Sequence, residues 1–170
     1  MVGIEHGNKK RLCELTPFIH PKHGGGKANL YLDFMVNYLK TNVYINYRTK
    51  KSAKNTFIFG SSLGGLVSLY AVLKYLKTFG KAGIFSLSFW YSEKMYEMLE
   101  KAPKSQAEIY MMCGYNEDAE ILPDLKKMYR LLDKSRCYCL LLSKKKIAKG
   151  GKHNEKLWRD IFAETIRWLF

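Results

Sequence analysis

The sequence predicts an α/β fold, a three-layer sandwich in which helices cover both faces of a mostly parallel sheet. The main observation is that short apolar runs of strand length alternate along the chain with longer amphipathic segments of helix length. Apolar strands separated by helices are typical of parallel sheets that are buried on both faces. The second observation is that apolar residues make up 47% of the 170 residues, which suffices for a core and excludes intrinsic disorder.

The first half of the chain is expected to contain two strands and two helices. The end of a strand is predicted at residues 2–4, followed by a loop rich in glycine and proline that runs to Gly26. A helix is predicted at residues 29–41 because apolar side chains recur there at helical spacing. A short apolar strand at residues 55–60 then leads into an amphipathic helix at residues 63–78.

The second half continues the alternation. The expected elements are a strand at 82–89, a helix near 92–101, a strand at 108–113, a helix at 119–133, a strand at 137–142 and a helix at 154–170. The last strand would direct Cys137 and Cys139 to one face, and we interpret both as core thiols rather than metal ligands because the chain has no CxxC pair. Neither a repeat nor a linker interrupts the pattern, so residues 1–170 are expected to form a single domain.

The charge of the chain is strongly basic. Its 29 basic and 15 acidic residues give a formal net charge of +14, which would attract nucleic acid, anionic lipid or an acidic substrate. No RRM, KH, zinc-finger or helix-turn-helix signature is present, so no specific nucleic-acid partner is expected and a solvated, lysine-rich surface is the simpler interpretation. One stretch, residues 134–152, contains seven basic residues and no acidic one.

The location of the protein is predicted from what the sequence lacks. No apolar run approaches the ~20 residues that a membrane span needs. The first residues have neither a basic segment nor an apolar segment of the kind found in signal peptides. We therefore expect a cytoplasmic protein without a membrane partner, and the oligomeric state stays open.

The most informative motif is Gly60-Ser61-Ser62-Leu63-Gly64, which fits the pattern G-x-S-x-G. An apolar strand runs into it and an amphipathic helix leaves it, as in the nucleophile elbow of hydrolases. In such a turn the serine adopts a strained backbone conformation, and the two outer glycines would leave room for it. We therefore predict that Ser62 is a catalytic nucleophile and that the backbone N–H of Leu63 stabilises an oxyanion. A phosphate-binding turn is the alternative, but no lysine follows in the position of a P-loop.

A serine nucleophile needs a general base at neutral pH. His153 lies between the last expected strand and the last helix, where the chain order of serine, acid and histidine in this class of hydrolase puts the base. The acid should follow the preceding strand, so Glu117 is the first candidate and Asp118 the alternative. It would hold the imidazole tautomer and stabilise the imidazolium. If both acidic residues merely begin a helix, Ser62 and His153 would act as a dyad.

A second glycine-rich segment, His23-Gly24-Gly25-Gly26, is similar to the HGGG oxyanion motif of lipases. That motif follows a strand, whereas this one follows a proline-rich loop, so we interpret it as a flexible loop near the mouth of the site. His20 and His23 have H-x-x-H spacing, but no acidic residue or cysteine lies near enough in sequence to complete a metal site. Neither a metal nor an organic cofactor is therefore expected.

Several segments point to a family when they are taken in order along the chain. They are Val2-Gly3-Ile4, Thr16-Pro17-Phe18, Tyr47-Arg48-Thr49, Gly60–Gly65, Ser88-Phe89-Trp90 and Gly150-Gly151-Lys152-His153-Asn154-Glu155 with Trp158. Together they resemble the "putative esterase" family of the α/β-hydrolase superfamily, the esterase D-like group that includes siderophore esterases. The resemblance implies an α/β-hydrolase fold and hydrolysis of a small-molecule ester, with Ser62 as nucleophile and His153 as base. It also implies that Arg11 contacts an anionic group of the substrate.

One departure from the family concerns the N-terminus. Members carry a substantial portion before the strand that residues 2–4 would end, whereas here that strand begins at Met1. The resemblance then implies a domain that lacks the N-terminal strands, including the neighbour of the elbow strand and the loop that gives the second oxyanion N–H. Loss of one oxyanion donor typically costs ~100–1000-fold in rate. A non-catalytic remnant or binding scaffold is therefore the alternative function.

Overall fold

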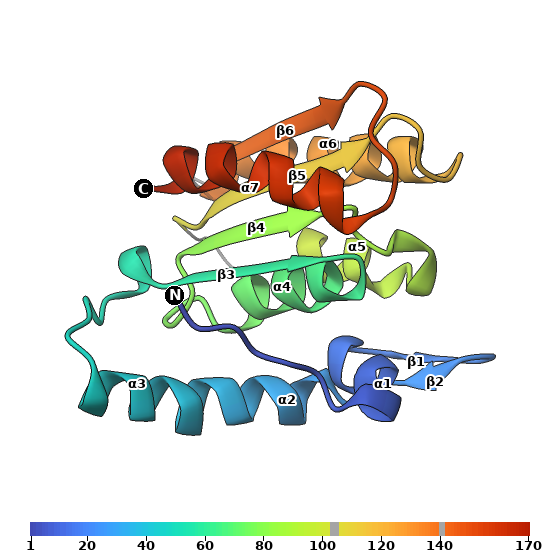
Figure 1. The fold of residues 1–170 in the computed structure, drawn as a ribbon. Coiled ribbons are helices and arrows are strands. Elements are labelled where there is room, and N and C mark those ends of the chain that lie inside the picture. The colour runs from blue at the N-terminus through green and yellow to red at the C-terminus, as the bar shows by residue number, and fades with distance from the viewer. Residues whose placement is uncertain (103–105, 140–141) are drawn as a thin grey trace.

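The computed structural model of the protein describes residues 1–102, 106–139 and 142–170 (Figure 1). Four strands form one sheet in the order β3-β4-β5-β6, and each neighbouring pair is parallel. The strands are β3 (Phe57–Ser61), β4 (Lys81–Phe85), β5 (Glu108–Gly114) and β6 (Leu142–Ala148). The predicted α/β fold with a parallel sheet is confirmed.

Helices cover both faces of this sheet. They are α4 (Leu63–Lys74), α5 (Lys94–Glu100), α6 (Ile121–Cys139) and α7 (Glu155–Leu169). In Figure 1, α7 lies on the near face and α6 on the far face. Successive strand residues point to opposite faces, so Ile84 and Ile109 pack in the core cluster that contains α4 and α6. Their neighbours Phe85 and Tyr110 pack in a second cluster with Leu157 of α7.

The residues before the sheet form a mainly helical region beside α4. The elements are α1 (Arg11–Leu15), a hairpin of β1 (Ile19–His20) and β2 (Gly24–Gly25), and a helical run of α2 (Ala28–Phe34), a π-helical segment (Met35–Leu39) and α3 (Lys40–Asn46). Short 3-10 turns occur at Asn8–Lys10, Ala53–Asn55 and Phe89–Tyr91. α1 packs against α2, β2 and α4, and Leu15 and Leu32 join the core cluster of α4. The helix predicted at 29–41 therefore forms and extends beyond both predicted ends.

Residues 2–4 do not form the predicted strand end. They have no regular structure, and Val2 and Ile4 are 49% and 41% exposed. A strand forms where a neighbour completes its backbone hydrogen bonds, and within residues 1–102, 106–139 and 142–170 no strand pairs with this segment. The prediction is wrong because, among the described residues, no neighbouring strand offers backbone hydrogen bonds to residues 2–4.

The predicted strand at 137–142 is misplaced. Helix α6 continues to Cys139, so both cysteines of that run lie in a helix rather than a strand, and β6 begins at Leu142. Residues 140–141 lie outside the described part of the chain. Three consecutive lysines, 144–146, explain the error, because they interrupt the apolar pattern from which a buried strand is predicted. None of the helices within the described ranges is long and apolar enough to cross a lipid bilayer.

Candidate active site

Each strand of the sheet ends in a segment that carries one polar side chain of the site. Ser62 follows β3, Ser86 follows β4, Glu117 follows β5 and His153 follows β6. The carboxyl ends of parallel strands lie along one edge of a sheet, which is where open α/β sheets bind their ligands. The strand order therefore brings together side chains that are far apart in the sequence.

The turn that carries Ser62 is sharp. Ser62 has φ +57° and ψ −123°, a conformation that residues other than glycine rarely adopt. Its backbone N–H donates to the carbonyl of Phe85 at 2.9 Å, which fixes the turn against β4. Helix α4 begins directly afterwards at Leu63, and N–H groups in the first turn of a helix have no acceptor within it. The Leu63 N–H is therefore a donor that remains available to a bound ligand.

The two outer glycines of the motif differ in their surroundings. A Cβ atom added at Gly60 would overlap the backbone of Gly64, whereas a Cβ added at Gly64 would meet no atom within 4 Å. The interpretation that both glycines make room for the turn therefore holds on steric grounds for Gly60 only.

We expect Gly60→Ala to lower the free energy of unfolding by about 1–3 kcal/mol, because backbone rather than a flexible side chain would have to move. Gly64→Ala is the matched control. It is expected to be neutral or to stabilise the protein by up to about 1 kcal/mol, since alanine favours a helix more than glycine does. Urea unfolding followed by circular dichroism measures both. Equal midpoints for the two variants would contradict the steric explanation.

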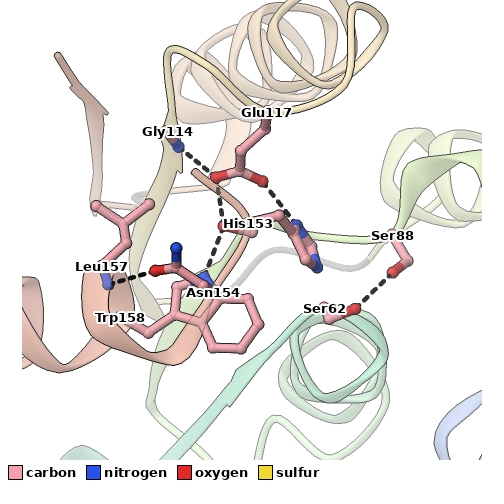
Figure 2. A network of polar contacts seen from close by, with 9 residues as sticks. Ser62, Ser88, Gly114, Glu117, His153, Asn154, Leu157 and Trp158 are labelled. Atoms are coloured by element: carbon pink, nitrogen blue, oxygen red, sulfur yellow. Dashed lines mark hydrogen bonds and ion pairs between the residues drawn. The ribbon is translucent and has the colours of Figure 1, made fainter. Parts of the chain in front are cut away.

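Glu117 and His153 form a hydrogen-bonded pair (Figure 2). Oε2 of Glu117 lies 2.8 Å from Nδ1 of His153, and the side chain of Glu117 is 0% exposed. A carboxylate at Nδ1 favours the tautomer in which Nδ1 carries the proton, so that Nε2 of the neutral ring is an acceptor. Asp118 is exposed, and within the described ranges its side chain makes no hydrogen bond or ion pair. The geometry therefore favours Glu117 over Asp118 as the partner of His153.

The second oxygen of Glu117 is also held. Oε1 accepts hydrogen bonds from the backbone N–H of Gly114 and from the hydroxyl of Ser86, the latter at 2.7 Å. The Ser86 hydroxyl in turn accepts from the indole N–H of Trp158 at 2.8 Å. The indole ring also stands edge-on to the imidazole of His153, with the centroids 5.1 Å apart. Trp158 thus contacts His153 directly and Glu117 through Ser86.

The hydroxyl of Ser62 points to a second serine. Its Oγ lies 3.3 Å from Oγ of Ser88. Figure 2 shows the ring of His153 between Glu117 and this serine pair, with a ring nitrogen toward each side. No hydrogen bond joins Ser62 to His153 among the contacts of the described residues. Hydrogen bonds of catalytic groups are often long without substrate and tighten when it binds, so the missing Ser62–His153 bond is compatible with the predicted roles of the two residues.

The sequence did not identify Ser86 or Ser88 as site residues and gave no role to Trp158. One signal for Ser86 is its place directly after an apolar strand that neighbours the elbow strand. Ser86 is 0% exposed and has φ +46°. This backbone turn ends β4 at Phe85, whereas the strand was predicted to continue to residue 89. Ser88 and Trp158 lie in segments that carry the family resemblance, but no local pattern gives either a role, because their contacts depend on the packing of distant segments.

Four of the seven basic residues in the stretch 134–152 fall into two groups. Lys144 and Lys146 of β6 form ion pairs with Glu164 of α7. The hydrogen bond from Lys146 is the main reason that the pKa of Glu164 lies below its usual value. These lysines therefore join the sheet to α7. Lys149 and Lys152 are exposed in the loop that follows β6.

Arg11 lies at the first residue of α1 and is half-buried. Its guanidinium makes no ion pair or hydrogen bond within the described part of the chain. Helix α1 packs against α4, the helix that begins directly after Ser62. The contact of Arg11 with an anionic group of a substrate stays a prediction.

The glycine-rich segment that begins at His23 forms an ordered hairpin. Its strand β2 pairs antiparallel with β1, and the hydroxyl of Tyr91 donates to the carbonyl of Gly24. The segment is therefore tied to the turn after β4 instead of forming a free loop. Outside the gaps at 103–105 and 140–141, no group of three or more His, Cys, Asp or Glu side chains is placed to bind a metal ion.

Cys113 is buried near the end of β5, next to the candidate site. Burial, and to a lesser extent the charge of Glu117, raises the pKa of its thiol to about 12 from 9.0. A thiol that holds its proton more tightly in the folded state stabilises the fold below pH 9.0, and this contribution is lost as the pH rises toward 12.

We expect this group alone to lower the free energy of unfolding by about 1.4 kcal/mol per pH unit above its unfolded pKa. Cys113→Ala loses packing at neutral pH but should show a shallower loss of stability between about pH 9 and pH 11. Urea unfolding at several pH values measures the slope for both proteins. Identical slopes would show that the thiol is not held protonated.

A family profile and a curated relative both match the chain over almost its whole length. The profile of the family described as "Putative esterase" matches residues 1–169. The protein YbbA of Bacillus subtilis (strain 168), described as uncharacterized, is 29% identical over 187 residues, which cover 100% of this chain and 72% of YbbA.

Solved structures of other proteins share the fold. The BES protein from Bacillus cereus superposes with a TM-score of 0.82 at 21% identity, over 99% of this chain and 66% of that one. The enterobactin esterase FES from Shigella flexneri superposes with a TM-score of 0.71 at 20% identity, over 98% of this chain and 41% of that one. The chain thus spans 66% or less of the length of these two structures.

Proposed function

The chain belongs to the "Putative esterase" family, and from this premise we propose that it is a serine carboxylic-ester hydrolase that acts through an acyl-enzyme. Family membership supports ester hydrolysis in general. One observation carries the serine mechanism: a serine in a strained strand-to-helix turn faces a histidine whose Nδ1 is bonded to a buried carboxylate. These are the roles of nucleophile, base and orienting acid in acyl transfer.

In the proposed acylation step, Nε2 of His153 takes the proton of the Ser62 hydroxyl while Oγ attacks the ester carbonyl carbon. The carbonyl oxygen becomes an oxyanion, and the N–H of Leu63 donates to it. Glu117 holds His153 in the required tautomer and stabilises the imidazolium. The tetrahedral intermediate collapses when the carbon–oxygen bond to the alcohol breaks and His153 gives its proton to the departing alcohol.

In the proposed deacylation step, water replaces the alcohol. Nε2 of His153 takes a proton from the water, whose oxygen attacks the acyl carbon. The second tetrahedral intermediate then releases the carboxylic acid, and His153 returns the proton to Ser62. All proton transfers pass through one imidazole, and no cofactor is required.

The proposed substrate is a small anionic ester. Lys149 and Lys152 are exposed before His153, and Arg11 has no partner within the described ranges. The net charge of +14 would also raise the encounter rate with an anion. The name of the similar Shigella flexneri structure, an enterobactin esterase, makes siderophore esters the first class that we propose to screen.

Labelling with a fluorophosphonate tests the proposal. An activated serine displaces fluoride from phosphorus and keeps the phosphonyl group, so mass spectrometry of the purified chain should locate an adduct on Ser62. Ser62→Ala should lose the adduct, and Ser52→Ala, a control at an exposed serine outside the candidate site, should keep it. If a folded chain gives no adduct, the non-catalytic binding scaffold becomes the better description.

A further inference from the structure

Three side chains lead by hydrogen bonds from α7 to the imidazole of His153, and they are named here the indole relay: Trp158, Ser86 and Glu117. The indole N–H of Trp158 donates to the Ser86 hydroxyl at 2.8 Å, and this hydroxyl donates to Oε1 of Glu117 at 2.7 Å. The other oxygen, Oε2, lies 2.8 Å from Nδ1 of His153. Ser86 and the side chain of Glu117 are both 0% exposed, so bulk water does not reach these two groups.

The direction of each bond in the indole relay follows from what the groups can do. An indole N–H can only donate and an ionised carboxylate can only accept, whereas a serine hydroxyl has one proton and can do both. The Ser86 hydroxyl lies between the two, so its proton must go to Glu117. The backbone N–H of Gly114 also donates to Oε1. Oε1 is therefore held by two donors, and Oε2 is left to accept from His153.

The backbone of Ser86 supports a role for its hydroxyl. Its φ of +46° lies in the left-handed region, which only glycine adopts without strain. Its N–H donates to the carbonyl of Met112 in β5 at 2.7 Å, which ties the turn to the strand that leads toward Glu117. A strained backbone that carries a buried hydroxyl with two partners indicates a function that glycine could not supply.

Trp158 is fixed relative to His153 because both lie at the start of α7. Asn154 caps this helix: its side chain accepts from the N–H of Leu157 at 3.0 Å, and its carbonyl accepts from the backbone N–H of Trp158 at 3.4 Å. Figure 2 shows Asn154, Leu157 and Trp158 together at this helix start. His153 directly precedes the cap, so one helical turn positions both the imidazole and the first donor of the indole relay.

We propose that Trp158 and Ser86 are positioning residues of the hydrolase. The indole N–H orients the Ser86 hydroxyl, which fixes Glu117 so that the imidazole of His153 keeps its proton on Nδ1. This inference rests on the proposed ester hydrolysis and adds two residues that act through Glu117 and His153. Such positioning matters for the rate, because misplacing a catalytic group by about 1 Å can cost roughly 100-fold.

Trp158→Phe keeps an aromatic ring and removes the N–H. We expect it to lower kcat for a p-nitrophenyl ester about 3- to 30-fold and to leave KM within about two-fold, because the lost bond orients the base and not the substrate. Trp168→Phe, the matched control, makes the same change on the same helix, where the Trp168 ring packs 5.7 Å from that of Tyr110. Its kcat should stay within about two-fold. Equal losses in both variants, or a change in KM alone, would overturn the proposal.

Ser86→Ala tests whether Trp158 acts through the hydroxyl. Without the hydroxyl the indole N–H has no acceptor, so Ser86→Ala/Trp158→Phe should be no slower than Ser86→Ala. Losses that multiply would mean that Trp158 acts on His153 through the ring contact alone, and the indole relay would be refuted. The comparison of Trp158→Phe with Trp168→Phe stands even if Ser86→Ala does not fold.

A measurement without turnover separates the indole relay from the proposed function. In the Ser62→Ala protein, long-range ¹H–¹⁵N correlation NMR of the neutral His153 ring, assigned by its loss in His153→Ala, reports which nitrogen carries the proton. We expect mainly Nδ1, a shift toward Nε2 when Trp158→Phe is added, and no shift with Trp168→Phe. This result in a chain that hydrolyses nothing would support the indole relay and refute the function. Hydrolysis with a tautomer that Trp158→Phe leaves unchanged would support the function and refute the indole relay.

Discussion

Replacing His153 with alanine is expected to lower kcat/KM for a p-nitrophenyl ester by about 10³–10⁶-fold, as loss of the base does in other serine hydrolases. Without the imidazole, the Ser62 hydroxyl has no group to take its proton. Spectrophotometric rates at pH 7–8 measure the loss. His6→Ala is the matched control, because His6 is exposed in the irregular segment before α1, and its rate should stay within about two-fold of the parent protein.

The double variant Ser62→Ala/His153→Ala tests whether the two residues act as one unit. The base has no function without the nucleophile, so the double variant should be no slower than either single variant. Losses that multiply would mean that the two side chains act independently, which would contradict an acyl-enzyme on Ser62 with His153 as its base.

Glu117→Gln is expected to lower kcat by about 10²–10⁴-fold, up to the loss seen when the triad acid of a serine protease becomes an amide. Glutamine has the same shape and can still accept from Gly114 and Ser86. Its NH₂ group, however, donates to Nδ1 of His153, which puts the imidazole proton on Nε2. That nitrogen can then no longer accept the proton of Ser62.

Asp118→Asn is the matched control for Glu117→Gln. The two acids are adjacent in sequence, but Asp118 is exposed whereas the Glu117 side chain is 0% exposed and bonded to His153. The Asp118 variant should keep kcat within about two-fold. Near-parental activity of both variants would favour a serine–histidine dyad, and a loss confined to Asp118→Asn would make that residue the acid.

The parts of the site that sequence could predict are those that follow recognisable strands. Ser62, Glu117 and His153 each come after a predicted strand, and the G-x-S-x-G pattern fixes the turn at Ser62. Ser86 and Trp158 escaped prediction because a hydroxyl and an indole become site residues only through contacts with Glu117 and His153 across the sheet.

The fold could be predicted where a strand has an apolar local pattern. It could not be predicted where a segment depends on partners that are far away in the sequence. Strands β3 and β5 are apolar and were expected within two residues of their observed bounds, whereas β4 ends four residues before the predicted end. β6 was misplaced because three lysines interrupt its apolar pattern, and the pairing of Lys144 and Lys146 with Glu164 of α7 is one that no local pattern reveals. Residues 2–4 have the composition of a strand but no pairing partner among the described residues.

The backbone at the ends of β3 and β4 has a consequence for the stability of the fold. Ser62 and Ser86 both have positive φ, which costs of order 1–3 kcal/mol at each residue other than glycine. Glycine at either position would relieve that cost but would remove a hydroxyl. At Ser86 that loss would also leave the Trp158 indole N–H without its acceptor and take one donor from the Glu117 carboxylate, so only Ser62→Gly is expected to raise the stability of the fold. If Ser62 is the proposed nucleophile, its strained backbone marks a position where a stabilising substitution is expected to come at the expense of function.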